Sequence, residues 1–353
     1  MSTTTLTTPQ PGALMAAEIA QQPDAWSTLL ADGASVIADV AREIARRKPR
    51  FVQFVARGTS DHAALYAKYL IEIRHGLPAG LVSPSTMTVY KATPDLRDVL
   101  YIAVSQSGGS PDLVTSVEVA RAQGATTVAI TNNDSSPLSE AAEFGINVLA
   151  GPEKSVAATK SYTSELLALY LLTEYMRDGN VDAVQALPAL GERVLAADES
   201  VRDVAQRYRF AQRLITTGRS YSYPTAREAA LKLMETSYLS AQAFSGADLL
   251  HGPLATVDPQ VPVIAVVPDS AGGAAMDPVL DRLRERNADV FGVGSAAHID
   301  GLAGGIALPA GTPDELSPLL EILPLQQLAL HLAIARGGDP DTPRGLRKVT
   351  ETL

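Results

Sequence analysis

Residues 105–110 read Ser-Gln-Ser-Gly-Gly-Ser and lie between an apolar segment, 100–104, and a helix-like segment that begins near Pro111. Backbone N–H groups at a helix N-terminus can bind an anion, serine hydroxyls add donors, and glycine lets a ligand approach the backbone closely. This stretch is therefore a candidate phosphate-binding loop that needs no lysine. An ordinary serine–glycine turn that caps a helix has the same composition, and the six residues alone do not distinguish the two.

Two other segments of the first half carry small hydroxyl residues. Gly-Thr-Ser at 58–60 follows the apolar run 51–56, and Val-Ala-Ala-Thr-Lys at 156–160 begins another helix-like segment. Neither Gly-x-Gly-x-x-Gly nor Gly-x-x-x-x-Gly-Lys-Ser/Thr is present. The sequence therefore does not indicate a binding site for a dinucleotide or a nucleoside triphosphate. A small phosphorylated metabolite fits these segments better.

The second half contains three charged residues, Glu228, Lys232 and Glu235, in one helix-like segment. Their i, i+4, i+7 spacing places them on one helix face, where a carboxylate can act as a general base beside a carbonyl group. A solvated charged face with a Glu–Lys pair has the same spacing and stays open as an alternative. His251, in a turn with glycine and proline, is a candidate acid–base group, unless it only bonds the nearby backbone.

Strand-like and helix-like segments alternate along the chain, which predicts an α/β fold with a parallel sheet. The strand-like segments of the first half are 51–56, 100–104, 126–131 and 146–149. Its helix-like segments are 27–48, 61–73, 111–123 and 157–176.

The second half repeats this order of elements. Residues 213–220 match the strand and loop at 50–60, and residues 263–273 match those at 100–110. Both matches are offset by about 160 residues, which predicts a duplicated domain with a boundary near 178–200. Two unrelated α/β domains are the alternative.

Taken together, residues 105–108, 58–60 and 158–160 resemble the phosphosugar site of sugar-isomerase (SIS) domains. From about residue 10 onward the chain resembles the isomerase half of glutamine–fructose-6-phosphate aminotransferases and, equally, stand-alone amino-sugar-phosphate isomerases and deaminases. Further motifs that carry the resemblance are 218–220, 228–235, 250–254 and 343–348.

The resemblance implies two tandem SIS subdomains, each a parallel sheet flanked by helices in a flavodoxin-like, three-layer α/β/α arrangement. We expect an N-terminal tail with a short helix at 1–25 and a first SIS domain with the phosphosugar site at 26–190. A second SIS domain is expected at 200–340, and a C-terminal tail that closes on the active site at 341–353.

The resemblance also assigns roles to residues. Five are expected to hold the phosphate: Ser60, Ser105, Gln106, Ser107 and Ser110. Five others are expected to contact the rest of the substrate: Gly58, Thr59, Val156, Ala157 and Thr159.

The expected catalytic residues lie mainly in the second half. Glu235 matches the base that moves a proton between C1 and C2, and Lys232 and Glu228 match its polar neighbours. His251 matches a histidine that assists ring opening and is supplied by the adjacent subunit, which implies a homodimer. Lys348 matches a tail lysine that forms a Schiff base with a ketose, although residues 349–353 depart from the family's pattern.

The resemblance implies an enzyme that abstracts the C2 proton of an amino-sugar 6-phosphate of the glucosamine 6-phosphate class, giving isomerisation and deamination to fructose 6-phosphate. Elimination of the 3-hydroxyl from N-acetylglucosamine 6-phosphate by the same base is one alternative. A sugar-phosphate sensor without turnover is another. The family's glutaminase uses an N-terminal cysteine and the chain has no cysteine, so we expect no glutaminase activity.

Composition narrows the classes of partner. The formal net charge is −10 and no large Lys/Arg cluster is present, which argues against nucleic acid. The five histidines lack metal-ligand spacing, so we expect neither a metal nor a cofactor. No signal peptide and no apolar run long enough for a membrane is recognised, and residues 1–10 read as a loose tail. The expected location is the cytoplasm.

Overall fold

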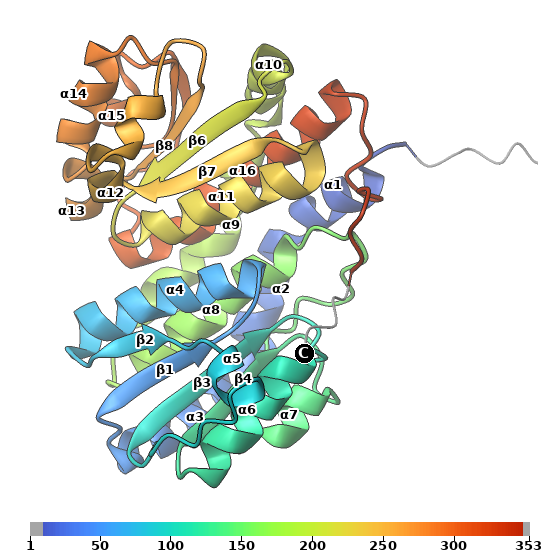
Figure 1. Cartoon of the computed structure of the whole chain (residues 1–353), viewed down its shortest axis with the longest axis vertical. Helices are drawn as coiled ribbons and strands as arrows, with labels where there is room; N and C mark the ends of the chain where they lie inside the picture. Colours follow the sequence, from blue (N-terminus) through green and yellow to red (C-terminus); the bar gives the residue numbers. More distant parts are fainter. Residues whose placement is uncertain (1–9, 349–353) are drawn as a thin grey trace, which may run out of the picture.

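The computed structural model describes residues 10–348 and contains two parallel five-stranded sheets, one in each half of the chain (Figure 1). The first sheet has the order β2-β1-β3-β4-β5 and consists of β1 (Phe51–Val55), β2 (Ala79–Leu81), β3 (Val99–Ser105), β4 (Thr126–Thr131) and β5 (Phe144–Asn147). The second has the order β10-β9-β8-β6-β7 and consists of β6 (Arg213–Gly218), β7 (Ser240–Ser245), β8 (Val263–Val267), β9 (Val290–Gly294) and β10 (Gly304–Ala307).

The two sheets share one topology. Read from β7, the second sheet runs β7-β6-β8-β9-β10 and repeats the first strand for strand, so that β6 corresponds to β1 and β8 to β3. All neighbouring strands are parallel. The predicted pair of tandem α/β subdomains is therefore confirmed.

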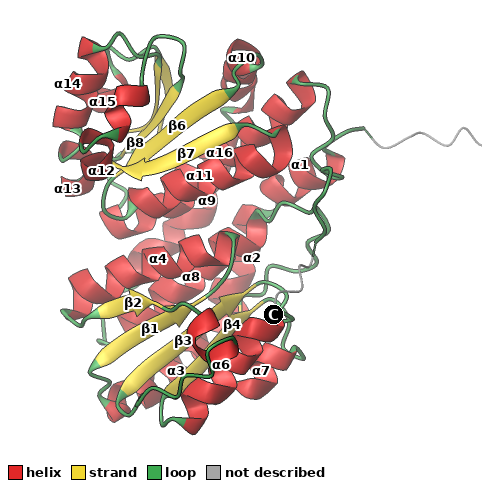
Figure 2. Cartoon of the chain, in the orientation of Figure 1, coloured by secondary structure: helices red, strands yellow, loops and turns green. Residues whose placement is uncertain are grey.

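Helices cover both faces of each sheet and give three layers in each half (Figure 2). The helices up to the middle of the chain are α1 (Ala13–Ala20), α2 (Gln22–Thr28), α3 (Ala34–Arg47), α4 (Thr59–Leu70), α5 (Ser85–Thr88), α6 (Pro111–Ala122), α7 (Pro137–Ala141) and α8 (Lys160–Tyr175). The later helices are α9 (Leu187–Leu195), α10 (Asp198–Tyr208), α11 (Ser222–Ser237), α12 (Gly246–Leu250), α13 (Ala271–Ala274), α14 (Asp277–Glu285), α15 (Ala296–Ile299) and α16 (Ser317–Ala335).

The two halves share one hydrophobic core. Helices α4 and α8 of the first half pack against α11 and α16 of the second, and lie between the two sheets (Figure 1). Side chains from both halves, including Trp26, Leu166, Leu233 and Leu328, belong to a single buried cluster. Burial of this much apolar surface fixes α11, with its charged residues, against the first half.

A polar contact within this core ties α11 to α16. Glu321 of α16 is fully buried and accepts hydrogen bonds from the hydroxyls of Ser222 and Thr225 of α11, both at 2.8 Å. Burial raises the pKa of Glu321 to about 7, although these hydroxyls oppose the shift. The first turn of α11 is thus held by directional bonds as well as by packing.

The expectation that no apolar segment is long enough to cross a membrane is wrong. Within residues 10–348, the helical segment Asp314–Ala335 is long and apolar enough, by length and composition alone, to cross a membrane. Most of this segment is buried inside the protein, as expected of a core helix.

The predicted elements mostly agree with the observed ones, with one displaced strand. The strand predicted at 146–149 is β5, Phe144–Asn147, and it ends at a local turn in which the side chain of Asn147 accepts a hydrogen bond from Leu149 N at 2.9 Å. The pattern missed the edge strand β2, and in the second half it did not locate β7, β9 or β10. The predicted tail at 1–10 lies, apart from Gln10, outside the described residues, as do residues 349–353.

Candidate functional site

A cavity of about 340 Å³ lies at the carboxyl edge of the first sheet. It is bounded by the ends of β1 and β3, the start of α8, helix α11 and the tail of the chain. Predicted site residues of the first half in its lining are Gly58, Thr59, Ser60, Ser105, Gln106, Ser107, Ser110 and Val156. Those of the second half and the tail are Lys232, Glu235 and Lys348.

The loop after β3 is folded back on itself. Ser105 Oγ accepts a hydrogen bond from Gly108 N at 3.2 Å, and Ser107 Oγ accepts one from Gly109 N at 3.3 Å. Gly108 has φ of 63°, and a Cβ at this position would lie 2.2 Å from Ser136 Oγ. Only glycine fits there, and the tight loop holds its serines beside the first turn of α6, where backbone N–H groups point outward.

Ser60 lies in the first turn of α4, which follows β1, the strand next to β3. It is buried, and its hydroxyl donates a hydrogen bond to Glu165 Oε1 of α8 at 2.9 Å. Burial raises the pKa of Glu165 well above its usual range, a shift that the Ser60 hydroxyl only partly opposes. Burial thus favours the neutral form of the Glu165 carboxyl group behind the Ser60 hydroxyl.

The charged residues of α11 form a buried cluster with the loop after β1. Lys232 Nζ lies 2.5 Å from Glu235 Oε2, 3.4 Å from Glu228 Oε1 and 3.0 Å from Thr59 Oγ1. Burial by itself lowers the pKa of Lys232, but the two carboxylates outweigh it and its pKa lies above the usual value. Lys232 is therefore a fixed ammonium group between two carboxylates. Glu235, whose side chain is 23% exposed, is the carboxylate that reaches the cavity.

Glu228 lies behind the cavity rather than in its lining. Its side chain is fully buried, accepts a hydrogen bond from Thr59 Oγ1 at 3.1 Å, and has His62 Nδ1 at 2.7 Å from Oε2. Thr59 and His62 both belong to α4. Glu228 therefore joins the α4 and α11 helices of the two halves beneath Lys232.

The tail returns to the same cavity. Leu346 and Arg347 line it beside Lys348, whose Nζ lies 2.9 Å from Glu153 Oε2. Burial by itself raises the pKa of Glu153, but Lys348 and the backbone N–H groups of Thr159 and Ser161 bring it below the usual value. The buried carboxylate of Glu153 thus holds the tail lysine against the cavity wall.

Three other predicted residues do not line the cavity. Ala157 and Thr159 are fully buried, because the segment before α8 turns inward where Thr159 N donates to Glu153 Oε1 at 2.9 Å. Ala158 and Ser161 take their place in the lining. His251 follows α12 and is exposed, so within the described residues of this chain it is not part of the cavity.

Arg57 is the charged lining residue of the first half that the sequence reasoning missed. Its position next to Gly58-Thr59-Ser60 was the available signal. The buried residues Glu165 and Glu153, and the pairing of His62 with Glu228, were missed as well, because these contacts join segments that are far apart in the sequence.

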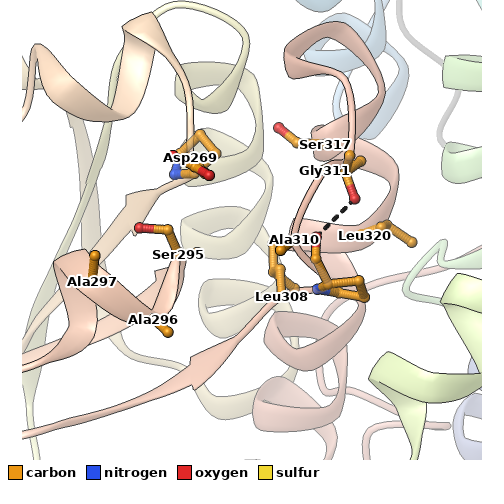
Figure 3. A pocket seen from close by; sticks show the side chains of 13 residues that line it. Asp269, Ser295, Ala296, Ala297, Leu308, Ala310, Gly311, Ser317 and Leu320 are labelled. Carbon is orange, nitrogen blue, oxygen red and sulfur yellow. Dashed lines mark hydrogen bonds between the residues drawn. The ribbon is translucent and has the colours of Figure 1, made fainter.

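A second cavity, of about 210 Å³, lies at the carboxyl edge of the second sheet. Figure 3 shows Ser295, Ala296 and Ala297 on one side of it and Leu308, Ala310 and Leu320 on the other. Its charged lining residue is Asp269, which follows β8 as Gln106 follows β3, and its lining contains no lysine or arginine. This cavity therefore offers an anion no cation from its lining residues.

Comparison with known proteins agrees with this geometry. The family model "SIS domain" matches residues 46–175 and again residues 208–334. A fold of two such α/β units, with a hydroxyl-rich cavity in the first, defines a double SIS protein. The chain belongs to the SIS family.

Individual relatives place the chain within that family. It is 34% identical over 346 residues to "Glutamine--fructose-6-phosphate aminotransferase [isomerizing]" of Thermococcus kodakarensis. The match covers 95% of this chain and 57% of the relative, so the chain spans little more than half of that protein. The C-terminal domain of glucosamine-fructose-6-phosphate aminotransferase from Francisella tularensis is 29% identical with a TM-score of 0.86, covering 94% of this chain and 98% of that one. Glucosamine-6-phosphate deaminase from Thermotoga maritima, at 21% identity, a TM-score of 0.79 and coverage of 96% and 99%, shares the fold.

Proposed function

We propose that this protein is a phosphosugar isomerase-type enzyme that acts on an amino-sugar 6-phosphate of the glucosamine 6-phosphate class. The observation that carries the proposal is one cavity with a serine- and amide-rich loop on one wall and Glu235, paired with Lys232, on another. The first set suits a phosphate dianion. The second suits proton transfer at a carbon beside a carbonyl group.

In the proposed reaction the open-chain sugar binds with its phosphate at the loop after β3. Glu235 removes the proton from C2, and the electron pair forms a C1–C2 double bond as the C1 carbonyl oxygen takes up a proton. Returning a proton to C1 gives an imine at C2. Water then adds at C2 and ammonia leaves, which yields fructose 6-phosphate. Lys232, held as a cation, stabilises the negative charge that develops on oxygen.

Two alternatives share the same base and the same phosphate site. With N-acetylglucosamine 6-phosphate the amide is a poor leaving group, and the C2 anion expels the 3-hydroxyl instead, so that the enzyme is a dehydratase. A sensor binds the sugar phosphate without turnover. The pairing of Glu235 with Lys232 favours an enzyme, because a binding site alone needs no base next to the sugar.

A product screen separates the three functions. Purified protein is incubated in deuterated water with the 6-phosphates of glucosamine, N-acetylglucosamine and galactosamine, and the products are followed by NMR. Deuterium at C2 or C1 with release of ammonia supports isomerisation and deamination, whereas loss of the 3-hydroxyl supports dehydration. If the protein binds a sugar phosphate but shows neither deuterium exchange nor product, the result supports a sensor.

Removal of two loop hydroxyls tests the phosphate site. In the double variant Ser105→Ala/Ser107→Ala we expect the KM for a sugar 6-phosphate to rise about 10- to 100-fold, since two hydrogen bonds to a charged group are lost. The kcat should change much less. Ser135→Ala, on an exposed loop outside the cavity, is the control. An unchanged KM in the double variant places the phosphate elsewhere.

We also propose that the enzyme is a homodimer in which His251 of one subunit completes the cavity of the other. His251 is exposed and away from the cavity of its own chain. The variants Glu235→Gln and His251→Asn are each expected to be nearly inactive. Co-expression should restore about a quarter of wild-type activity, because half of the dimers are mixed and each mixed dimer has one site with both residues intact. If His251 acts within its own chain, mixing restores nothing.

A further inference from the structure

Arg57 has no assigned role, although it lines the cavity at the point where two loops meet. It is the second residue after the end of β1 and lies directly before Gly58. About half of its side chain is exposed.

The guanidinium is held from behind by a buried carboxylate. Arg57 Nε donates to Asp112 Oδ2 at 2.9 Å, and an Nη of Arg57 lies 2.7 Å from the same oxygen. Asp112 has a side chain only 1% exposed and lies in the first turn of α6. The pair therefore ties the loop after β1 to the loop after β3 and fixes the plane of the guanidinium.

This arrangement leaves donors for a ligand. A guanidinium has five N–H groups, and two of its nitrogens contact Asp112. The Asp112 carboxylate is buried behind Arg57, whereas the guanidinium is half-exposed at the cavity. We therefore expect the N–H groups that do not contact Asp112 to face the cavity. An arginine oriented in this way matches the geometry of a phosphate.

Two lysines of the cavity are ion-paired with glutamates. Lys232 lies between Glu228 and Glu235, and Lys348 pairs with Glu153. Arg57 is the cation that belongs to the same loop as Ser60 and is bonded to the helix that follows the serine loop.

We propose that Arg57 is a substrate-binding residue that donates to the phosphate group of the sugar, with Asp112 as the residue that orients it. This inference rests on the proposed function, because it takes the substrate to be a sugar phosphate. It adds a charged, geometrically fixed donor to a site that the serine hydroxyls and backbone amides would otherwise form alone.

The test compares binding of phosphorylated and unphosphorylated ligands. Calorimetry measures the affinity of glucosamine 6-phosphate, fructose 6-phosphate and glucosamine for the wild type and for Arg57→Gln, Arg57→Lys and Asp112→Asn. Arg57→Gln should weaken both phosphate ligands at least about tenfold, Arg57→Lys should recover only part of this, and Asp112→Asn should have an intermediate effect. Arg97→Gln breaks an exposed pair with Asp95 outside the cavity and should bind like the wild type.

Each result has one meaning. If the wild type binds a sugar phosphate and Arg57→Gln binds it within twofold, the inference is wrong and the proposed function stands. If the wild type binds none of the sugar phosphates, the proposed function fails, and the inference fails with it. If Arg57→Gln loses the same affinity for glucosamine as for glucosamine 6-phosphate, Arg57 has only a structural role. Thermal unfolding of the ligand-free variants shows whether such a loss of affinity comes from a less stable protein.

Discussion

Replacing Glu235 by glutamine is expected to lower kcat at least about 100-fold, which is the low end of the range for loss of a general base. The amide keeps the size of the side chain but cannot accept the C2 proton. Affinity for the sugar phosphate should stay within about threefold, since the phosphate loop lies on another wall of the cavity. Steady-state kinetics and the incorporation of deuterium at C2 are the measurements.

The control for this variant is Glu285→Gln. Glu285 is a similarly ion-paired glutamate, but it is exposed on α14 and pairs with Arg282 away from the cavity. We expect wild-type kcat and normal deuterium exchange. A Glu235→Gln enzyme with kcat near that of the control would remove Glu235 from its proposed role as the base.

Replacing Lys232 by methionine is expected to lower the free energy of unfolding by about 3–5 kcal/mol. Lys232 is 1% exposed and Glu228 is fully buried, so the substitution leaves a buried carboxylate without its neighbouring ammonium group. It also leaves Glu228 and Glu235 on the same face of α11 with no cation between them. Urea denaturation followed by circular dichroism near pH 7.5 measures the change.

Lys68→Met is a matched control, because Lys68 also forms an i, i+4 pair with a glutamate, Glu72, on a helix. That pair is partly exposed, with 27% and 36% of the side chains accessible, and its loss should cost less than about 1 kcal/mol. The double variant Glu228→Gln/Lys232→Met should be more stable than Lys232→Met alone, since it removes the buried carboxylate that has lost its ammonium neighbour. Equal losses in Lys232→Met and Lys68→Met would contradict the buried-charge argument.

Local pattern was sufficient for most of the fold. Apolar runs of five or six residues predicted β1, β3 and β4, and Pro111 marked the start of α6, because these signals depend only on neighbours along the chain. The edge strands β2 and β7 were not predicted, since a strand paired on one side needs no continuous apolar sequence, and β9 and β10 were not located either. The end of β5 coincides with a turn at Asn147, a local contact that periodicity does not register.

The loops of the site were also predictable, because they directly follow predicted strands. In a parallel sheet the carboxyl ends of strands meet at one edge, so Ser60 and Ser105 had to be neighbours once both strands were recognised. Lys232 and Glu235 are on the other half of the chain, and only the resemblance to SIS domains linked them to those loops in advance.

The amino-acid sequence by itself determined the duplicated α/β order, the composition of the phosphate loop and the charged face of α11, since each of these depends on residues within a few positions of one another. The tertiary structure decided which distant polar side chains are partners around the site: Asp112 with Arg57, His62 with Glu228, Glu165 with Ser60, and Glu153 with Lys348. The partners in these pairs lie from 55 to 195 residues apart. Which distant side chains meet in a buried environment depends on how the two halves pack, and that packing is set by the whole shared core rather than by any one segment.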